Sequence, residues 1–197
     1  MDLTKLIELA SANNGIIRTK QVVDAKIAKD YITRAVSERV LERIDHGVYL
    51  LSGTIPDDYF LLQIKRSRIV FSHTTSAYLN HLTTRDPIML SFTVPLKYNV
   101  TELAGEGHKV YFSLPKNYNL GIIETKTMFG NPIRIYDAER TICDLFSARS
   151  EEDPYIALES LKTYLTSKEK DIFKLTEYAK QLGVEKTIRK KVEAMSI

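Results

Sequence analysis

The stretch VLERIDHGVYLL, residues 40–51, decides how the N-terminal part of this chain folds. Residues 40–44 are predicted to form a β-strand, and the Asp-His-Gly run at 45–47 is typical of a tight turn. Residues 48–51 then predict the returning strand. The sequence therefore predicts a β-hairpin here, and the elements before it determine the class of module.

Three short helices are predicted before the hairpin. Residues 2–12 carry apolar side chains at helical spacing, and the Asn-Asn-Gly run at 13–15 ends that helix because Asn and Gly tolerate the left-handed conformation. Thr19 is the predicted N-cap of a second helix over residues 20–25, and residues 26–29 are the connecting turn.

The third helix is predicted to begin at Asp30, with Ile32, Ala35 and Val36 facing inward. A hairpin directly after such a helix is the wing of a winged helix-turn-helix. This module usually reads duplex DNA by placing its third helix in the major groove. We therefore expect residues 1–54 to form a DNA-binding domain.

The third helix is expected to present these outward side chains to the major groove: Asp30, Tyr31, Thr33, Arg34 and Ser37. Of these, Tyr31, Thr33 and Arg34 are the predicted readers of the bases. Arg34 is the best candidate for a base-edge contact, because a guanidinium can donate two hydrogen bonds to guanine O6 and N7. The surrounding basic residues are expected to contact phosphates, which fix register without reading sequence: Lys20, Lys29, Arg39 and Arg43. His46, at the wing tip, is expected to touch the DNA backbone or the minor groove.

A second interpretation of this module is a protein-docking or purely structural role. Residues 1–55 hold eight basic and seven acidic side chains, which is a weak positive balance and not a basic stripe. Under this interpretation Arg34 is a solvated surface residue, and His46 belongs to ordinary turn chemistry.

Composition indicates a soluble globular protein of one or two domains, with 197 residues, 44% hydrophobic and 27% charged. There is no apolar run of membrane-spanning length and no apolar signal-peptide core at the N-terminus, so we expect a cytoplasmic protein without a membrane partner. The lone Cys143 fits a reducing compartment and is expected to be a buried, inert thiol. The four histidines are scattered, so neither a metal site nor a cofactor is predicted.

The Gly-Thr-Ile-Pro run at 53–56 is the predicted boundary to a second domain over residues 55–197. This part is expected to form a small sheet flanked by helices, with a helical cap at its C-terminal end. Its predicted strands cover residues 68–71, 88–94, 109–113, 120–128 and 132–136. A first helix is predicted to begin at residues 57–58. Further helices are predicted over residues 72–79, 137–147, 153–165, 168–182 and 185–195. The fold class predicted for the whole chain is α+β.

Three stretches together resemble a known family. They are ERIDHGVY at 42–49, SHTTSAYL at 72–79 and IRIYDAERTICDL at 133–145. In order and spacing they resemble the AbiEi-type antitoxins of bacterial abortive-infection, type IV toxin–antitoxin systems. The C-terminal helices, with Tyr178-Ala179 before a final basic helix, are similar to the ending of that family.

The resemblance implies an antitoxin that represses transcription of its own operon by binding inverted repeats in the promoter through the winged helix. It also implies that the C-terminal domain counters a nucleotidyltransferase-like toxin, without requiring a stable complex with it. No enzymatic activity is expected. The sequence shows no heptad seam or obvious apolar patch, so we expect a monomer that fills adjacent half-sites.

The alternative is a metal-dependent nuclease of the PD-(D/E)xK type, guided to DNA by the winged helix. Its candidate residues are Asp86, before a predicted strand, and Glu124 with Lys126 on a later strand. Two carboxylates can hold magnesium, and a lysine can stabilise the attacking water or the charge of the transition state. Glu124 and Lys126 equally fit a solvent-facing side of a strand.

The remaining candidates have structural interpretations. Asp137 is a predicted N-cap and Arg140 can pair with Asp144 one turn on, so residues 137–141 are interpreted as a lock between sheet and helices. His73 could act as a base, but the sequence identifies no nucleophile and orienting carboxylate for it. From Lys162 onward, nine basic and five acidic residues fit a solvated helix face or an extended phosphate-contacting surface.

Overall fold

The computed structural model describes residues 3–101, 103 and 107–195, and these residues divide into two compact units. The first unit comprises residues up to 65 together with 126–132. The second comprises residues 66–125 and those from 133 on. The mixture of helices and strands confirms the predicted α+β class.

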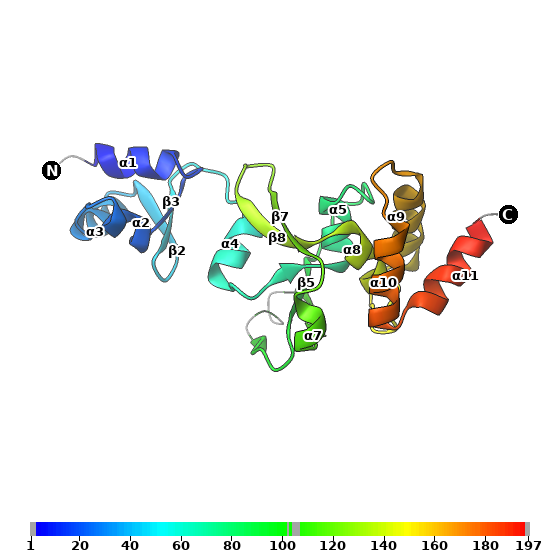
Figure 1. Ribbon diagram of the computed structural model, residues 1–197. Coiled ribbons are helices and arrows are strands. Elements are labelled where there is room, and N and C mark those ends of the chain that lie inside the picture. The colour runs from blue at the N-terminus through cyan, green and yellow to red at the C-terminus, as the bar shows by residue number, and fades with distance from the viewer. Residues whose placement is uncertain (1–2, 102, 104–106, 196–197) are drawn as a thin grey trace. The chain divides into compact units, whose positions relative to one another are not determined.

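The first unit follows the predicted order of helices and hairpin. Its elements are α1 (Thr4–Ser11), β1 (Ile16–Arg18), α2 (Thr19–Asp24), α3 (Asp30–Ser37), β2 (Leu41–Asp45), β3 (Val48–Leu51) and α4 (Asp58–Lys65). They run from blue to cyan in Figure 1, with the β2–β3 hairpin following α3. Asp2, which we included in the first helix, lies outside the described residues.

The three strands form an antiparallel sheet in the order β1-β3-β2, and side chains alternate between its two faces along β3. Tyr49 and Leu51 contact the core that the first three helices bury. Val48 and Leu50 contact Leu61 of α4 on the other face. The sheet is therefore covered on both sides, and α4 packs as part of this unit.

This packing places α4 in the N-terminal unit, whereas the sequence analysis drew the boundary between residues 54 and 55. A buried carboxylate just before α4 also connects residues 126–132 to this unit. Asp57 accepts hydrogen bonds from Thr127 Oγ1 at 2.5 Å and from Asn131 Nδ2 at 2.7 Å. The hairpin turn at residues 126–132 is thereby joined to the start of α4. That 1–54 and 55–197 act as separate functional domains stays a prediction.

One strand of this unit was not expected from the sequence, and one predicted helix cap was wrong. Residues 16–18 form a strand, because they pair with β3, a partner that lies some thirty residues on and gives no local signal. Thr19 is the first residue of α2 and does not cap it, because Arg18 is the N-cap and its backbone N–H donates to Gln21 Oε1 at 2.8 Å. Val36 is half-buried, while Ile32 and Ala35 are buried as expected.

The second unit is built on a five-stranded mixed sheet in the order β6-β5-β4-β8-β7. The strands are β4 (Val70–Phe71), β5 (Ser91–Pro95), β6 (Lys109–Ser113), β7 (Ile122–Lys126) and β8 (Pro132–Tyr136). β4 runs antiparallel to β5 and parallel to β8, and β5 runs parallel to β6. β7 and β8 are neighbours, as the predicted hairpin requires.

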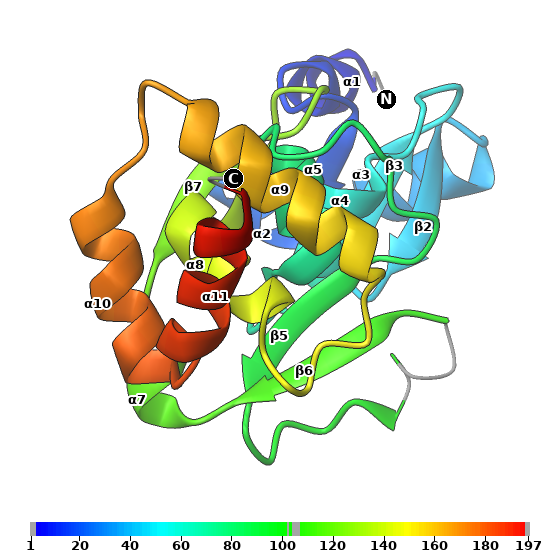
Figure 2. The same ribbon diagram turned by 90° about the vertical axis from the view of Figure 1, so that its right-hand side faces the viewer.

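The helices of this unit are α5 (His73–Leu79), α7 (Pro115–Tyr118), α8 (Ala138–Leu145), α9 (Pro154–Thr166), α10 (Ile172–Leu182) and α11 (Glu185–Met195). Figure 2 shows α8, α9, α10 and α11 gathered into one helical group. Their buried residues form a continuous core with Ala77 of α5 and Leu82 just after it. This helical group is the predicted C-terminal cap.

Several boundaries differ from expectation in the second unit. β5 begins at Ser91 because Ile88 and Met89 stay exposed. α10 begins at Ile172 and not at 168, since Asp171 caps it by accepting a hydrogen bond from the Lys174 N–H at 2.9 Å. The short helix α7 was not expected from the sequence.

Candidate functional site

The third helix of the first unit offers a polar outer face. Ile32 and Ala35 are buried in the unit's core, and this orientation turns Thr33, Arg34 and Ser37 outward, where they are exposed. Tyr31 is half-buried and packs against the core, so only part of it remains for a partner. Asp30 is exposed as well, so four of the five outward side chains predicted for this helix lie on the accessible side of α3.

Arg34 is held by its own helix. Its Nε donates to Glu38 Oε1 at 2.6 Å, in an ion pair whose side chains are 42% and 44% exposed. The Ser37 hydroxyl donates to the Arg34 carbonyl at 2.7 Å. An exposed i,i+4 pair contributes only about 0.3–0.5 kcal/mol, so a nucleic-acid base can displace Glu38 at low cost.

The wing tip brings a second pair of candidates together. Arg43 Nη2 lies 3.4 Å from His46 Nδ1, and the His46 N–H donates to Asp45 Oδ1 at 2.6 Å. The β2–β3 register shifts between Arg43 and Asp45, a β-bulge that twists the hairpin locally. The bulge thus places Arg43 and His46 side by side at the tip.

The wing is fastened to the second helix. The Thr19 backbone N–H donates to the Gly47 carbonyl at 2.9 Å, and Gly47 adopts a φ of +70° that favours glycine. The wing turn and the start of α2 therefore form one connected surface feature.

The predicted phosphate contacts are all exposed: Lys20 on α2, Lys29 just before α3, Arg39 just after it, and Arg43 on β2. Arg39 has a positive φ of 58°, and its carbonyl accepts a hydrogen bond from the Ser52 hydroxyl at 2.7 Å. Thus eight of the nine predicted DNA-binding residues are exposed on the same unit, and Tyr31 is half-buried. That they contact DNA stays a prediction.

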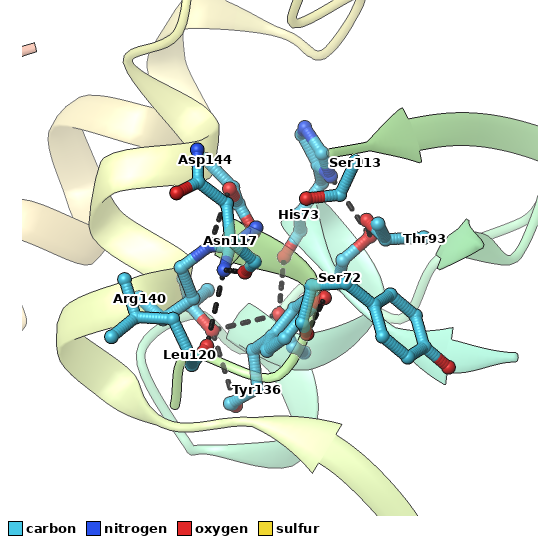
Figure 3. Close-up of polar contacts among 12 residues, drawn as sticks. Ser72, His73, Thr93, Ser113, Asn117, Leu120, Tyr136, Arg140 and Asp144 are labelled. Atoms are coloured by element: carbon cyan, nitrogen blue, oxygen red, sulfur yellow. Dashed lines mark hydrogen bonds and ion pairs between the residues drawn. The ribbon is translucent and has the colours of Figure 1, made fainter. Parts of the chain in front are cut away.

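A buried polar network in the second unit was not expected from the sequence (Figure 3). Ser72 directly follows β4, and its Oγ accepts a hydrogen bond from the hydroxyl of Thr93 on β5 at 2.9 Å. Ser72 Oγ also lies 2.9 Å from His73 Nδ1. The His73 ring stacks on Tyr111 with centroids 3.5 Å apart, and burial lowers the pKa of His73 to about 4. The ring is therefore neutral at physiological pH.

The helix α8 carries the predicted lock. Asp137 caps it by accepting a hydrogen bond from the Arg140 N–H at 2.8 Å, and Arg140 Nε lies 2.9 Å from Asp144 Oδ1. Lys174 of α10 pairs with Asp137 and Glu139 at 3.0 Å each. The N-cap and the Arg140–Asp144 pair were both predicted, and the network ties the sheet to the C-terminal helices.

Cys143 lies on α8 and is fully buried, as predicted, and burial raises the pKa of its thiol well above the ordinary value. A protonated, buried thiol is a poor nucleophile.

The residues of the nuclease alternative do not come together around one strand. Glu124 and Lys126 lie on β7 at one edge of the sheet, whereas Asp86 precedes β5, which is three strand positions away. That separation is about 14 Å across the sheet. Among the described residues, no group of three or more His, Cys, Asp or Glu side chains is arranged to hold a metal ion.

Three helices, a small antiparallel sheet and a wing directly after α3 define the first unit as a winged helix-turn-helix module. Residues 5–52 match the model of a family described as a transcriptional regulator, the AbiEi antitoxin. Over these residues the chain is similar to that regulator family. The resemblance predicted from the sequence is confirmed over these residues.

One solved structure resembles almost the entire chain. It is the crystal structure of the RV2827C protein from Mycobacterium tuberculosis, with a TM-score of 0.61 and 10% sequence identity over 90% of this chain and 71% of that chain. At this identity the similarity shows the fold alone. A search of curated proteins finds no match. Among the described residues, no helix combines the length and apolar character needed to cross a bilayer.

Proposed function

We propose that this protein is an antitoxin that represses transcription of its own toxin–antitoxin operon by binding inverted repeats in the promoter. The observation that carries the proposal is the polar, exposed face of α3, followed by a bulged wing, in a domain that matches the regulator family. This is the geometry that places a helix in the major groove and a hairpin beside it.

The roles of the residues follow from their positions. Arg34 reads a guanine edge after exchanging Glu38 for the base, with Thr33 and the exposed part of Tyr31 contacting neighbouring bases. Lys20, Lys29 and Arg39 contact phosphates, and Ser37 faces the groove beside Arg34. Arg43 with His46 places the wing on the DNA backbone or in the minor groove.

Each copy acts as a monomer on one half-site, so the promoter repeat is filled by two copies. In the same proposal the second unit counters a nucleotidyltransferase-like toxin in a system that aborts phage infection. That antagonism does not require the two proteins to bind each other directly.

The experiment that tests the repressor role is a footprint of the full chain on the region upstream of its own gene. We expect protection of an inverted repeat in the parent protein, and loss of that protection in Arg34→Ala. An unchanged footprint in Arg34→Ala together with Thr33→Ala would show that α3 does not read the repeat.

A plasmid incubation with magnesium separates this role from the nuclease alternative. We expect no cleavage by the parent protein. Cleavage by the parent that is lost in Glu124→Ala would favour the enzyme instead.

A further inference from the structure

The second unit contains a cavity of about 380 Å³ that the repressor role does not use. Its wall includes His73 at the start of α5, Ser113 at the end of β6, Asn117 of α7, Arg140 and Asp144 of α8, and Val184 between α10 and α11. Many ligand pockets fall in this range of volume and combine apolar walls with a few placed polar groups.

Asp144 presents an unsatisfied acceptor in this wall. The residue is 8% exposed, and its Oδ1 accepts from Arg140 Nε at 2.9 Å. Its other oxygen, Oδ2, is buried and forms no hydrogen bond within the described residues. Leaving a buried carboxylate oxygen unpaired is costly, so the site fits a molecule that brings an N–H or O–H donor.

His73 presents a donor in the same wall. The Thr93 hydroxyl donates to Ser72 Oγ, so the Ser72 hydroxyl hydrogen is available for His73 Nδ1 at 2.9 Å. A neutral ring that accepts at Nδ1 carries its hydrogen on Nε2. Within the described residues Nε2 forms no hydrogen bond of its own.

The Arg140 guanidinium in the wall is already committed to contacts within the fold. Arg140 pairs with Asp144, and its Nη1 donates to the carbonyls of Asn117 at 2.5 Å and Leu120 at 3.1 Å. Its guanidinium also lies 4.1 Å from the centre of the Tyr136 ring. The Arg140 and Asp144 charges balance, and Arg149, the other arginine of the wall, is exposed, so the buried part of the wall favours a neutral ligand over a phosphate.

Asp144 of α8 and His73 of α5 both line this cavity, and both are labelled in Figure 3. Among the charged groups near His73, Asp144 has the largest effect on the pKa of the imidazole. One edge of a small planar molecule can therefore face both groups.

We propose that this cavity binds a small neutral heterocycle or aromatic amide, whose edge donates an N–H to Asp144 Oδ2 and accepts from His73 Nε2. This donor-beside-acceptor edge is the pattern shared by the nucleobases and by a carboxamide. The proposal is independent of DNA binding by the first unit.

The test uses the full-length protein and five probes that carry this edge: adenosine, guanosine, cytidine, uridine and nicotinamide. Saturation-transfer NMR detects binding of each probe, and calorimetric titration measures its affinity. The nucleosides and nicotinamide separate a nucleobase ligand from a simple aromatic amide. We expect at least one probe to bind and inorganic phosphate not to displace it.

Two variants locate the binding. Asp144→Asn exchanges the free acceptor for a donor and is expected to weaken binding by about tenfold or more. Ala148→Phe adds bulk to the cavity from an exposed position in its wall and replaces none of the polar groups, and it is expected to abolish binding. Ala148→Ser is the matched control and should bind as the parent does.

Circular dichroism establishes that each variant is folded. If Asp144→Asn does not fold, the comparison of Ala148→Phe with Ala148→Ser shows whether the probe binds in this cavity. Absence of binding for all five probes to the folded parent overturns the proposal. So does binding that Ala148→Phe leaves unchanged, or displacement of the probe by phosphate.

Discussion

The Arg34 guanidinium and the Glu38 carboxylate meet at 2.6 Å on the exposed side of α3. This pair holds the predicted base reader against its own helix while no DNA is bound. A good two-bond contact to guanine discriminates by about 1–3 kcal/mol, which exceeds the value of an exposed helical ion pair. Recognition by Arg34 therefore includes an exchange of Glu38 for a base.

If Arg34 exchanges Glu38 for a base, variants at the two residues should change DNA affinity in opposite directions. Arg34→Ala should lose about 1–3 kcal/mol of binding to the promoter repeat and relax the preference at one base pair. Glu38→Gln should bind DNA more tightly, because it weakens the ion pair on Arg34 and removes a negative charge. Fluorescence anisotropy on the repeat and on single-base variants measures both effects. Equal losses of affinity in the two variants would contradict the exchange.

Lys29 is predicted to contact a phosphate and not a base. Lys29→Ala should weaken binding to every sequence alike and reduce the slope of log Kobs against log salt by about 1. Titrations at several salt concentrations, on repeat and scrambled DNA, provide the measurement. A loss confined to the repeat would instead identify Lys29 as a base reader.

The wing depends on Gly47. A Cβ at this position would lie 3.2 Å from Thr19 Oγ1, and the φ of +70° is strained for any other L-residue. Gly47→Ala should destabilise the fold by about 1–2 kcal/mol and weaken DNA binding by displacing the wing. Thermal unfolding and anisotropy together measure these effects.

Gly53→Ala is the matched control for the wing, because Gly53 has a φ of +81° and no atom within 4 Å of the added Cβ. It should reduce stability through backbone strain alone and leave DNA affinity unchanged. If both alanine variants weaken DNA binding equally, the wing has no specific part in it.

His73 makes stability depend on pH. Its folded pKa of about 4 lies below the ordinary 6.5, so the unfolded chain binds the proton first. The contribution to stability is complete above pH 6.5 and is lost as pH falls toward 4, by about 3 kcal/mol in total. Urea unfolding at pH 7.5, 6, 5 and 4 should show this loss.

His73→Asn provides the control for the pH dependence, since Asn tolerates the positive φ of 50° at this position and does not titrate in that range. Glu152 also has a lowered pKa: burial raises it, but the hydrogen bonds from Lys109 and Ser91 outweigh burial. Its effect is present in both proteins, so their difference reports His73. Identical pH profiles for parent and variant would show that His73 is not the buried titrating group.

Predictions that rest on local chemistry succeeded in this chain. Asp30 begins α3, Asp137 caps α8, and Arg140 pairs with Asp144, because each signal lies within one or two helical turns. The hairpin at residues 41–51 was equally visible, since a tight turn joins two short strands that follow each other directly in the sequence.

Predictions that need partners far along the chain failed or could not be made. The strand at residues 16–18 depends on β3, and Asp57 bonds to Asn131, 74 residues away. The cavity joins His73 to Asp144 from separate helices. His73 was noticed in the sequence, but no spacing rule could connect it to that carboxylate.

The most direct test of the central claim is a titration of the full chain against two labelled duplexes. One carries the inverted repeat upstream of its own gene, and the other carries the same bases in scrambled order. At physiological salt we predict binding of the repeat that is at least about a thousandfold tighter, with the preference reduced in Arg34→Ala. Equal affinity of the parent protein for both duplexes would contradict the claim that α3 and its wing read DNA sequence.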